Sequence, residues 1–437
     1  MHNSDAHREN TISPKKQIAL IVLCWAAYTL AYFGRYSYTS NGIPIQKFYE
    51  VSKEEFSLAT TFFFFAYGAG QIINGILCRR YNMRFMIFGA LIISAVINLS
   101  VFSGIQFYLI KYLWLLNGLC QSVLWASLLR ILSCYIDKKR MKTAILFMST
   151  TVSIGTFVIY GISALFNLFD GFKYVFLFAF AFVTAVALIW VLFYSKLTDN
   201  ARLENESIKK TAEEKVAEDC KDLSADRGTS ASGKVFNVFL LIIILFCVYA
   251  IAINFAKDGL TTWIPQILNE QYALSDSLSI ILTLVLPVFG IAGALAAVFL
   301  NKFIKEYSDI LGIFFAVAAA CVLGIIFLFK TDYWYLTLVL FGLISLLMHG
   351  ANNVVTSMFP LSLGRKHNAG LVGGLLNGAC YVGSTLSQYV IAIIATAGGW
   401  GAVMDVLMYS CAALAALSLA VGIVRVAVLK STNIKIK

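Results

Sequence analysis

The chain has 437 residues, of which 59% are hydrophobic and 13% are charged, and its formal net charge is +11. Soluble globular proteins average about 25% charged residues, so this composition excludes that class. Repeated apolar runs of about 20 residues, each long enough to cross a hydrocarbon core roughly 30 Å thick, indicate a protein that crosses a membrane many times.

Twelve membrane-spanning helices are predicted from the apolar runs and the charged breaks between them. They cover residues 18–43, 56–78, 85–103, 108–135, 143–166, 172–194, 235–268, 276–300, 310–330, 333–358, 370–396 and 401–428. One long hydrophilic segment, rich in Lys, Glu, Asp and Ser, separates six spans from six and is typical of a linker. We therefore predict an all-α membrane protein with an N-terminal six-helix bundle in residues 1–194, a central loop in 195–234 and a C-terminal six-helix bundle in 235–437.

The start of the chain and its cysteines predict neither processing nor a cofactor. Residues 1–17 are polar and lead into an apolar run much longer than the core of a signal peptide, so we expect no cleaved leader. The nine cysteines are scattered without a C-x-x-C pair, so neither a zinc site nor a disulfide framework is expected.

Basic residues are divided unequally between the two sides of this topology. The side with both termini and the central loop holds 26 of the 34 lysines and arginines, counting Arg425 at the end of the last span, whereas the opposite loops hold four and the other spans four. Because cytoplasmic loops are enriched in Lys and Arg, we expect both termini to lie in the cytoplasm, with the chain in the cell (inner) membrane. The positive charge then lies beside anionic lipid headgroups and requires no nucleic-acid partner.

Two cations occupy matching places in the two halves. Arg35 lies near the middle of the first predicted span, nine residues before Pro44, and Lys257 lies in the seventh span, eight residues before Pro265. A charge inside a bilayer costs roughly 2.5–3.5 kcal/mol on insertion scales, so its presence indicates a function. Matching features in two repeats are typical of a transporter that binds its substrate where the repeats meet.

Acidic residues are scarce in these spans. None of the 23 Asp and Glu residues lies in the first six, and Asp258 is the one deep in the second six. Asp258 directly follows Lys257, and consecutive helix residues do not face each other, so we expect it to be a poor counter-ion. The intramembrane site should then be net positive and bind an anion. Arg35 can alternatively extend to an interface, or be satisfied by carbonyls and tyrosine hydroxyls.

Arginine and lysine together suit a dianionic headgroup, because the guanidinium binds phosphate or carboxylate bidentately and the ammonium adds a point charge. Polar residues in the same spans favour a hydroxylated substrate, and they are Tyr36, Tyr38, Asn41, Tyr67, Gln71, Asn74, Asn254, His349, Asn352, Asn353, Asn377 and Tyr381. Each can instead form a helix–helix hydrogen bond, and His349 can alternatively act as a proton-linked switch. Arg130 is expected to make a structural or gating contact, and Lys111 to extend towards the membrane surface.

The loop after the second span, "GILCRRYNMR", resembles the G-x-x-x-D-R-x-G-x-R loop of the major facilitator superfamily. Gly75, Arg80 and Arg84 match this pattern, whereas Arg79 replaces the acidic residue and Asn82 the second glycine. The resemblance implies two pseudo-symmetric six-helix bundles. We expect Arg80 and Arg84, like Asp258, to make gating or structural contacts.

More specifically, the chain resembles the organophosphate:phosphate antiporters, which include bacterial glycerol-3-phosphate and hexose-phosphate transporters. The matching stretches lie in both halves and read "YFGRYSYTSNGIP", "AYGAGQIINGIL", "NGLCQSVLWASLLR", "KDGLTTWIPQIL" and "PLSLGRKHNAGLVGGLLNGACYVGS". That family binds phosphate between an arginine in span one and an arginine in span seven. The resemblance implies these roles for Arg35 and for Lys257, which keeps the charge but not the planar fork.

Other positions agree with that family or depart from it. Tyr67 and Tyr381 match tyrosines that face the pore. Gln71 stands where a lysine is usual, and Val152 stands where a histidine occurs in glycerol-3-phosphate transporters. Phosphate recognition is therefore expected, without glycerol-3-phosphate itself being indicated.

Three functions follow from these features. The first is a secondary active transporter that moves an organic anion, with a sugar phosphate or polyol phosphate favoured, in exchange for inorganic phosphate. The alternatives are a proton-coupled carrier for a carboxylate or sulfonate, with Asp258 as the titrating group, and a membrane sugar-phosphate sensor. An enzyme is not expected, since a phosphate-binding glycine loop, a metal cluster and a nucleophile motif are all missing from the sequence. The expected partners are the organic anion, inorganic phosphate and membrane lipids, with the protein acting as a monomer.

Overall fold

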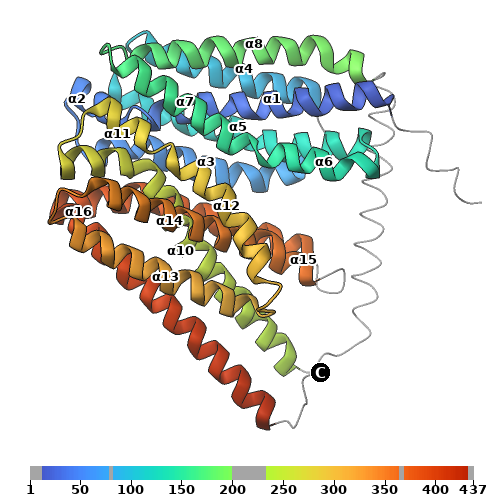
Figure 1. Ribbon diagram of the computed structural model, residues 1–437. Coiled ribbons are helices and arrows are strands. Elements are labelled where there is room, and N and C mark those ends of the chain that lie inside the picture. The colour runs from blue at the N-terminus through green and yellow to red at the C-terminus, as the bar shows by residue number, and fades with distance from the viewer. Residues whose placement is uncertain (1–11, 78–81, 199–232, 364–368, 432–437) are drawn as a thin grey trace, which may run out of the picture. The chain divides into compact units, whose positions relative to one another are not determined.

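The computed structural model describes residues 12–77, 82–198, 233–363 and 369–431, and every regular element in these ranges is a helix (Figure 1). The N-terminal helices are α1 (Pro14–Thr39), α2 (Gly42–Tyr49), α3 (Lys53–Leu77), α4 (Met83–Phe102), α5 (Phe107–Tyr135), α6 (Lys138–Ser149), α7 (Thr151–Asn167) and α8 (Lys173–Thr198). The C-terminal helices are α10 (Gly233–Tyr272), α11 (Asp276–Leu282), α12 (Val285–Leu300), α13 (Tyr307–Leu328), α14 (Trp334–Asn353), the π-helix η2 (Val354–Met358), α15 (Phe359–Leu363) and α16 (Ala369–Ser431). Arg80 and most of the predicted central loop lie outside the described residues.

Eleven stretches of the described chain are long and apolar enough to cross a membrane. The last covers Val372–Arg425, whose 54 residues would extend about 80 Å as one helix, far more than one crossing needs. Gly399 interrupts α16 with φ 73°, a conformation that a residue without a Cβ adopts at little cost. The chain thus forms two spans here, and the predicted all-α fold with many membrane crossings is confirmed.

Backbone contacts group the chain into two compact units. Unit 1 comprises Met1–Tyr38, Phe65–Ile159 and Lys173–Ile242, and unit 2 comprises Thr39–Phe64, Tyr160–Phe172 and Ile243–Lys437. In unit 1, α4 packs against α5 and α8; in unit 2, α12 packs against α14, and α13 packs against α14 and α16. The six-plus-six division into bundles stays a prediction.

The two matching prolines lie in different local structures. The first predicted span ends early, because α1 stops at Thr39 and Pro44 lies in the first turn of α2, where a backbone N–H is not required. Pro265 lies inside α10 and cannot donate to the carbonyl of Thr261. The hydroxyl of Tyr160 in α7 donates to that carbonyl at 3.4 Å. A side chain of unit 2 thus replaces the helical hydrogen bond that the proline removes.

Candidate functional site

Arg35 is buried in the span formed by α1, with 8% of its surface exposed. Its Nε donates to Oε1 of Gln121 at 3.3 Å. Its guanidinium carbon lies 4.4 Å from the ring centre of Tyr67 and 4.8 Å from that of Tyr32. A desolvated contact of this kind contributes on the order of 2 kcal/mol, so two aromatic faces offset part of the cost of placing the cation in the membrane.

Gln121 is oriented by neighbours from three helices. Its Nε2 has acceptors at Ser94 Oγ (2.9 Å), Asn117 Oδ1 (3.0 Å) and Ala31 O (3.3 Å). Because the amide nitrogen points at these acceptors, its oxygen is left to face Arg35. The network therefore holds the guanidinium in place from the α5 side.

Gly34 allows α1 to approach α4 and α5 closely beside this arginine. Its carbonyl accepts from Asn98 Nδ2 at 3.1 Å and from Asn117 Nδ2 at 2.9 Å. A Cβ at this position would lie 2.5 Å from Ser94 Oγ, which is too close for any side chain to occupy without a shift. The position of Arg35 thus depends on the small residue that precedes it.

Tyrosines form an aromatic cluster on the other side of Arg35. The hydroxyl of Tyr28 lies 3.4 Å from that of Tyr67 and accepts from Tyr32 at 3.5 Å. Gln71 lies one turn further along α3 and is half-buried. Tyr38, by contrast, is fully buried against Trp114, with ring centres 4.9 Å apart. The structure thus brings Arg35 and Tyr67 together and places Tyr38 in the packing between α1 and α5.

In unit 2, Lys257 forms an ion pair with the residue that follows it. Its Nζ lies 3.4 Å from Asp258 Oδ1, and both side chains are largely buried. Ser384 Oγ of α16 donates to Asp258 Oδ2, and Gln388 Nε2 donates to the Asp258 carbonyl at 3.5 Å. The expectation of a poor counter-ion is therefore wrong, because the ammonium of Lys257 reaches the carboxylate of the next residue while Ser384 of α16 donates to that carboxylate.

The remaining predicted residues of unit 2 lie on the three helices around this ion pair. Asn254 Nδ2 donates to Asn352 Oδ1 at 3.0 Å, and Cys380 Sγ lies 3.7 Å from the same oxygen, so α10, α14 and α16 are joined. His349 Nδ1 contacts the Ser345 carbonyl of its own helix at 2.8 Å. Tyr381 follows Cys380 on α16 and is half-buried. Substrate contact by these residues stays a prediction.

The predicted structural cations are placed differently from one another. Arg84 Nε donates to the Val191 carbonyl at 3.0 Å, and Trp190 Nε1 donates to the Arg84 carbonyl at 3.1 Å, so this pair of contacts joins α4 to α8. Arg130 is half-buried near the end of α5. Lys111 lies near the start of α5, with its Nζ 5.2 Å from the ring centre of Tyr112.

A group of polar contacts that the sequence did not predict lies within unit 2, where α2 and the start of α3 meet α10 and α11. Lys47 Nζ lies 2.7 Å from Asp276 Oδ1, Lys53 Nζ lies 2.9 Å from Glu270 Oε2, and the amides of Gln46 and Gln266 bond at 2.9 Å. We call these six residues the polar latch. Their sequence signal is weak, because charges near helix ends are ordinary and their pairing depends on the tertiary fold.

Known proteins resemble the chain at low identity. Sugar phosphate exchanger 3 of Homo sapiens is 21% identical over 387 residues, which cover 80% of this chain and 77% of that protein. Membrane sensor protein UhpC of Escherichia coli (strain K12) is 28% identical over 108 residues, which cover 25% of this chain and 24% of that protein. The similarity to a sugar phosphate exchanger agrees with the predicted resemblance to sugar-phosphate transporters.

Solved transporter structures share the fold. A D-xylose-proton symporter superposes with a TM-score of 0.73 at 10% identity, covering 92% of this chain and 97% of that chain. A bacterial homologue of the human lysosomal transporter Spinster, inward-facing and occupied, gives 0.70 at 16% identity, covering 93% and 96%. The sequence profile described as "Major Facilitator Superfamily" matches residues 24–388. This multi-pass membrane protein is therefore a transporter, not an enzyme, and belongs to the Major Facilitator Superfamily.

Proposed function

We propose that this transporter carries a phosphorylated sugar or polyol in exchange for inorganic phosphate. The observation that carries the proposal is the buried guanidinium of Arg35 between Gln121 and the faces of Tyr32 and Tyr67. The similarity to sugar phosphate exchanger 3 over 80% of the chain supports the substrate class.

Arg35 supplies the chemistry that a phosphate group requires. A guanidinium stays charged at every physiological pH and presents donors that match two phosphate oxygens. Its attraction to an anion is stronger in a buried, low-dielectric site than in water. The hydroxyls of Tyr28 and Tyr67, 3.4 Å apart, add donors on the same side for phosphate oxygens or substrate hydroxyls.

Lys257 supplies the second cation, and Asp258 regulates it. While the pair is formed, the carboxylate neutralises the ammonium in the empty carrier. An incoming phosphate competes with Asp258 for Lys257, so the carboxylate determines which charge state of the substrate binds best. Because the pair of Lys257 and Asp258 has no net charge while it is formed, the uncompensated positive charge that we propose for substrate binding is that of Arg35, which favours a monoanionic phosphate.

The polar latch gives the exchange cycle a contact that must break. A carrier of this family exposes its substrate alternately to the two sides of the membrane. We propose that the latch closes the end of unit 2 where α2 meets α11, and that it opens when substrate enters from that side. Partly exposed ion pairs contribute only about 0.2–1 kcal/mol each, which makes the contact readily reversible.

A second candidate is a proton-coupled carrier for a carboxylate or sulfonate. The observation in its favour is the largely buried Asp258, whose Oδ2 accepts from Ser384, because an intramembrane carboxylate is a natural proton carrier. In that case uptake of the carboxylate depends on a proton gradient and is lost in Asp258→Asn.

Proteoliposomes loaded with labelled inorganic phosphate test the proposal. Addition of one sugar phosphate or polyol phosphate outside should release the label, and Arg35→Ala should abolish the release. Lys111→Ala is the matched control, because it also removes a cation from a predicted span, but near the start of α5 and outside the proposed phosphate site. It should release the label like the wild type. Substrate binding without release would support a sensor, and carboxylate uptake under a proton gradient would support the second candidate; either result overturns phosphate exchange.

We further propose that the protein lies in the cell (inner) membrane with both termini in the cytoplasm. The unequal division of lysines and arginines between the two sides supports this orientation. A reporter active only in the cytoplasm, fused after Lys437, should be active, and one inserted beside Lys330 should be silent. The opposite pattern of reporter activity would show that the termini lie on the other side of the membrane.

A further inference from the structure

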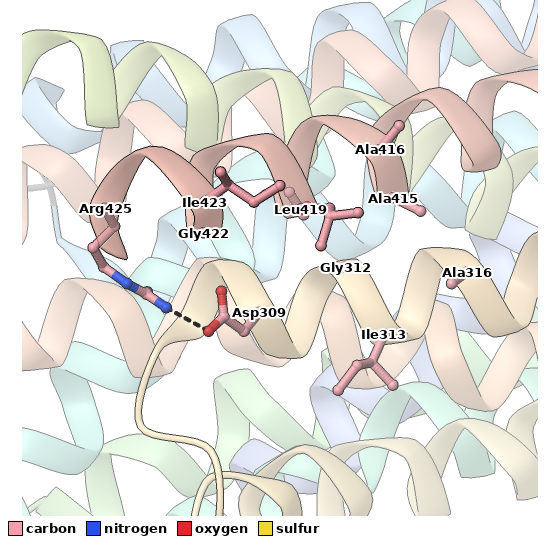
Figure 2. Close-up of a pocket in the computed structure, with 11 residues that line it drawn as sticks. Asp309, Gly312, Ile313, Ala316, Ala415, Ala416, Leu419, Gly422, Ile423 and Arg425 are labelled. Carbon is pink, nitrogen blue, oxygen red and sulfur yellow. Dashed lines mark hydrogen bonds and ion pairs between the residues drawn. The ribbon is translucent and has the colours of Figure 1, made fainter. Parts of the chain in front are cut away.

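A groove runs between α13 and the C-terminal part of α16 in unit 2 (Figure 2). Its volume is about 860 Å³, within the range of small-molecule sites. Small residues line it, namely Gly312 and Ala316 on α13 and Ala416 and Gly422 on α16, together with the buried Ser418. The groove is therefore an apolar channel between two helices.

The groove faces the surroundings of the protein. Leu419 and Ile423, which border it, are 66% and 61% exposed, and both lie in a membrane-spanning stretch. From Ala415 to Arg425 the lining extends about 15 Å along α16. That length is half of a hydrocarbon core roughly 30 Å thick, so it matches the acyl region of one leaflet.

Charged residues occupy one end of the groove, where both spans end. Figure 2 shows the ion pair of Arg425 with Asp309, in which Nη2 lies 2.6 Å from Oδ2; outside that view, Nη1 of Arg425 lies 2.9 Å from Glu306 Oε2. The arginine and the two carboxylates together carry one net negative charge. The guanidinium has five donors, of which these contacts use two, and the side chain of Glu306 is 57% exposed.

This arrangement of charges selects among headgroups. A phosphate group can bind the guanidinium of Arg425, but an anionic headgroup without an amine also meets two carboxylates and is repelled. A headgroup that carries a primary ammonium beyond its phosphate satisfies both signs, because the ammonium donates to Glu306 while the phosphate accepts from Arg425. Choline headgroups carry a cation without an N–H and lose the donated bond.

We propose that this groove binds one phosphatidylethanolamine molecule, with an acyl chain along Gly312 and Ala416 and the headgroup on Arg425 and Glu306. This lipid site is separate from the residues proposed to bind the transported anion. Its occupancy ties α13 to α16 beyond the ion pairs that already join them. The proposal does not depend on which anion is carried.

Native mass spectrometry of the purified full-length protein tests the site. Delipidated protein is titrated with phosphatidylethanolamine, phosphatidylcholine or phosphatidylglycerol of identical acyl chains. We expect phosphatidylethanolamine to bind roughly tenfold more tightly than the others, the difference typical of a charge-assisted hydrogen bond. Equal binding of the three lipids would overturn the proposal, as would a preference for phosphatidylglycerol.

Two variants locate the binding. Ala416→Leu fills the groove without touching the ion pairs, and it should lower phosphatidylethanolamine binding roughly tenfold. Ala413→Leu makes the same change at an exposed position of α16 outside the groove and should bind like the wild type. Glu306→Gln should retain lipid but lose the preference for the ethanolamine headgroup. Unchanged binding in Ala416→Leu, or formation of a dimer with no lipid bound, would overturn the assignment.

Discussion

Lys47 and Asp276 are 229 residues apart in the sequence, yet Nζ of the lysine lies 2.7 Å from Oδ1 of the aspartate. Asn269 Nδ2 donates to the same oxygen at 3.0 Å. The pair joins α2, which follows the first span, to α11, which follows the seventh. Lys47 is 61% exposed, so the pair is screened by water and contributes little by itself. The second ion pair of the latch is more enclosed, because Lys53 is 21% exposed and Trp400 Nε1 donates to Glu270 at 2.8 Å.

This difference predicts unequal effects of removing the two lysines. Lys53→Met should shift the latch towards its open form by about 1 kcal/mol, or roughly fivefold, whereas Lys47→Met should have less than half that effect. Ser57→Cys, at a fully buried position near the start of α3, reports the opening through its rate of reaction with a membrane-impermeant maleimide. Equal labelling rates in the two variants would show that the ion pairs do not control access.

The pair of Lys257 and Asp258 predicts a dependence of transport on pH. Phosphate monoesters lose their second proton near pH 6, so the monoanion becomes scarce above that pH. While Asp258 pairs with Lys257, the guanidinium of Arg35 is the charge that balances a monoanion in the proposed function, and wild-type exchange should fall as the pH rises from about 6 to 8.

Asp258→Asn should reverse this slope, because the variant has two net positive charges and favours the dianion. The asparagine oxygen can still accept from Ser384, which keeps the contact between α10 and α16. Asp276→Asn makes the same chemical change in the polar latch and should leave the direction of the wild-type slope unchanged. Exchange by Asp258→Asn that still falls with pH would exclude the proposed charge balance. The measurement is phosphate exchange in proteoliposomes across this pH range.

The membrane dictates much of this fold, which is why the sequence predicts it. A hydrocarbon core demands apolar runs of one length, so the spans are visible without tertiary information. The ends of individual helices cannot be predicted from the thickness of the membrane. The sequence predicts a first span that reaches residue 43, but α1 ends at Thr39 and α2 begins at Gly42; the side chain of Asn41 between them bonds to α7, a contact that no sequence pattern shows.

The sequence predicts the charged residues of the candidate site but not the contacts that orient them. Arg35 stands out because a cation in an apolar run is costly. The orientation of Gln121 depends on acceptors from three helices, and no sequence pattern shows it. The ion pair of Lys257 with Asp258 is not predicted from the angle between consecutive helix residues. That angle takes no account of the length of a lysine side chain or of the hydroxyl that Ser384 donates to the carboxylate. Tertiary contacts decide both.

Gly34→Ala should displace Arg35 without removing it. The added Cβ would lie 2.5 Å from Ser94 Oγ, so the Ser94 hydroxyl, which accepts from Gln121, or α1 itself must shift. Overpacking of this kind typically costs about 1–3 kcal/mol of stability, and we expect a lower Tm together with weaker binding of inorganic phosphate. Gly89→Ala is the control, because nothing lies within 4 Å of its Cβ position. Adding Ser94→Ala to Gly34→Ala should recover part of the lost stability. A Tm and phosphate affinity of Gly34→Ala equal to those of the wild type would contradict the close approach of α1 to Ser94.

Tyr67→Phe and Tyr38→Phe make the same change at two buried tyrosines with different surroundings. The Tyr67 ring lies 4.4 Å from the guanidinium carbon of Arg35, and its hydroxyl lies 3.4 Å from that of Tyr28. Phenylalanine keeps the cation–π contact and removes one donor, so we expect inorganic phosphate to bind roughly tenfold more weakly to Tyr67→Phe. Tyr38→Phe should bind phosphate like the wild type, since that ring packs on Trp114.

Isothermal titration of the purified variants with inorganic phosphate separates the two roles. Tyr67→Ala adds a further test, because it also removes the aromatic face and should weaken binding more than Tyr67→Phe does. If Tyr67→Phe and Tyr38→Phe bind phosphate equally, the Tyr67 hydroxyl does not contact the anion. If Tyr38→Phe alone binds weakly, the binding surface lies on the α5 side of α1, and the tyrosine cluster serves only to stabilise the buried guanidinium of Arg35.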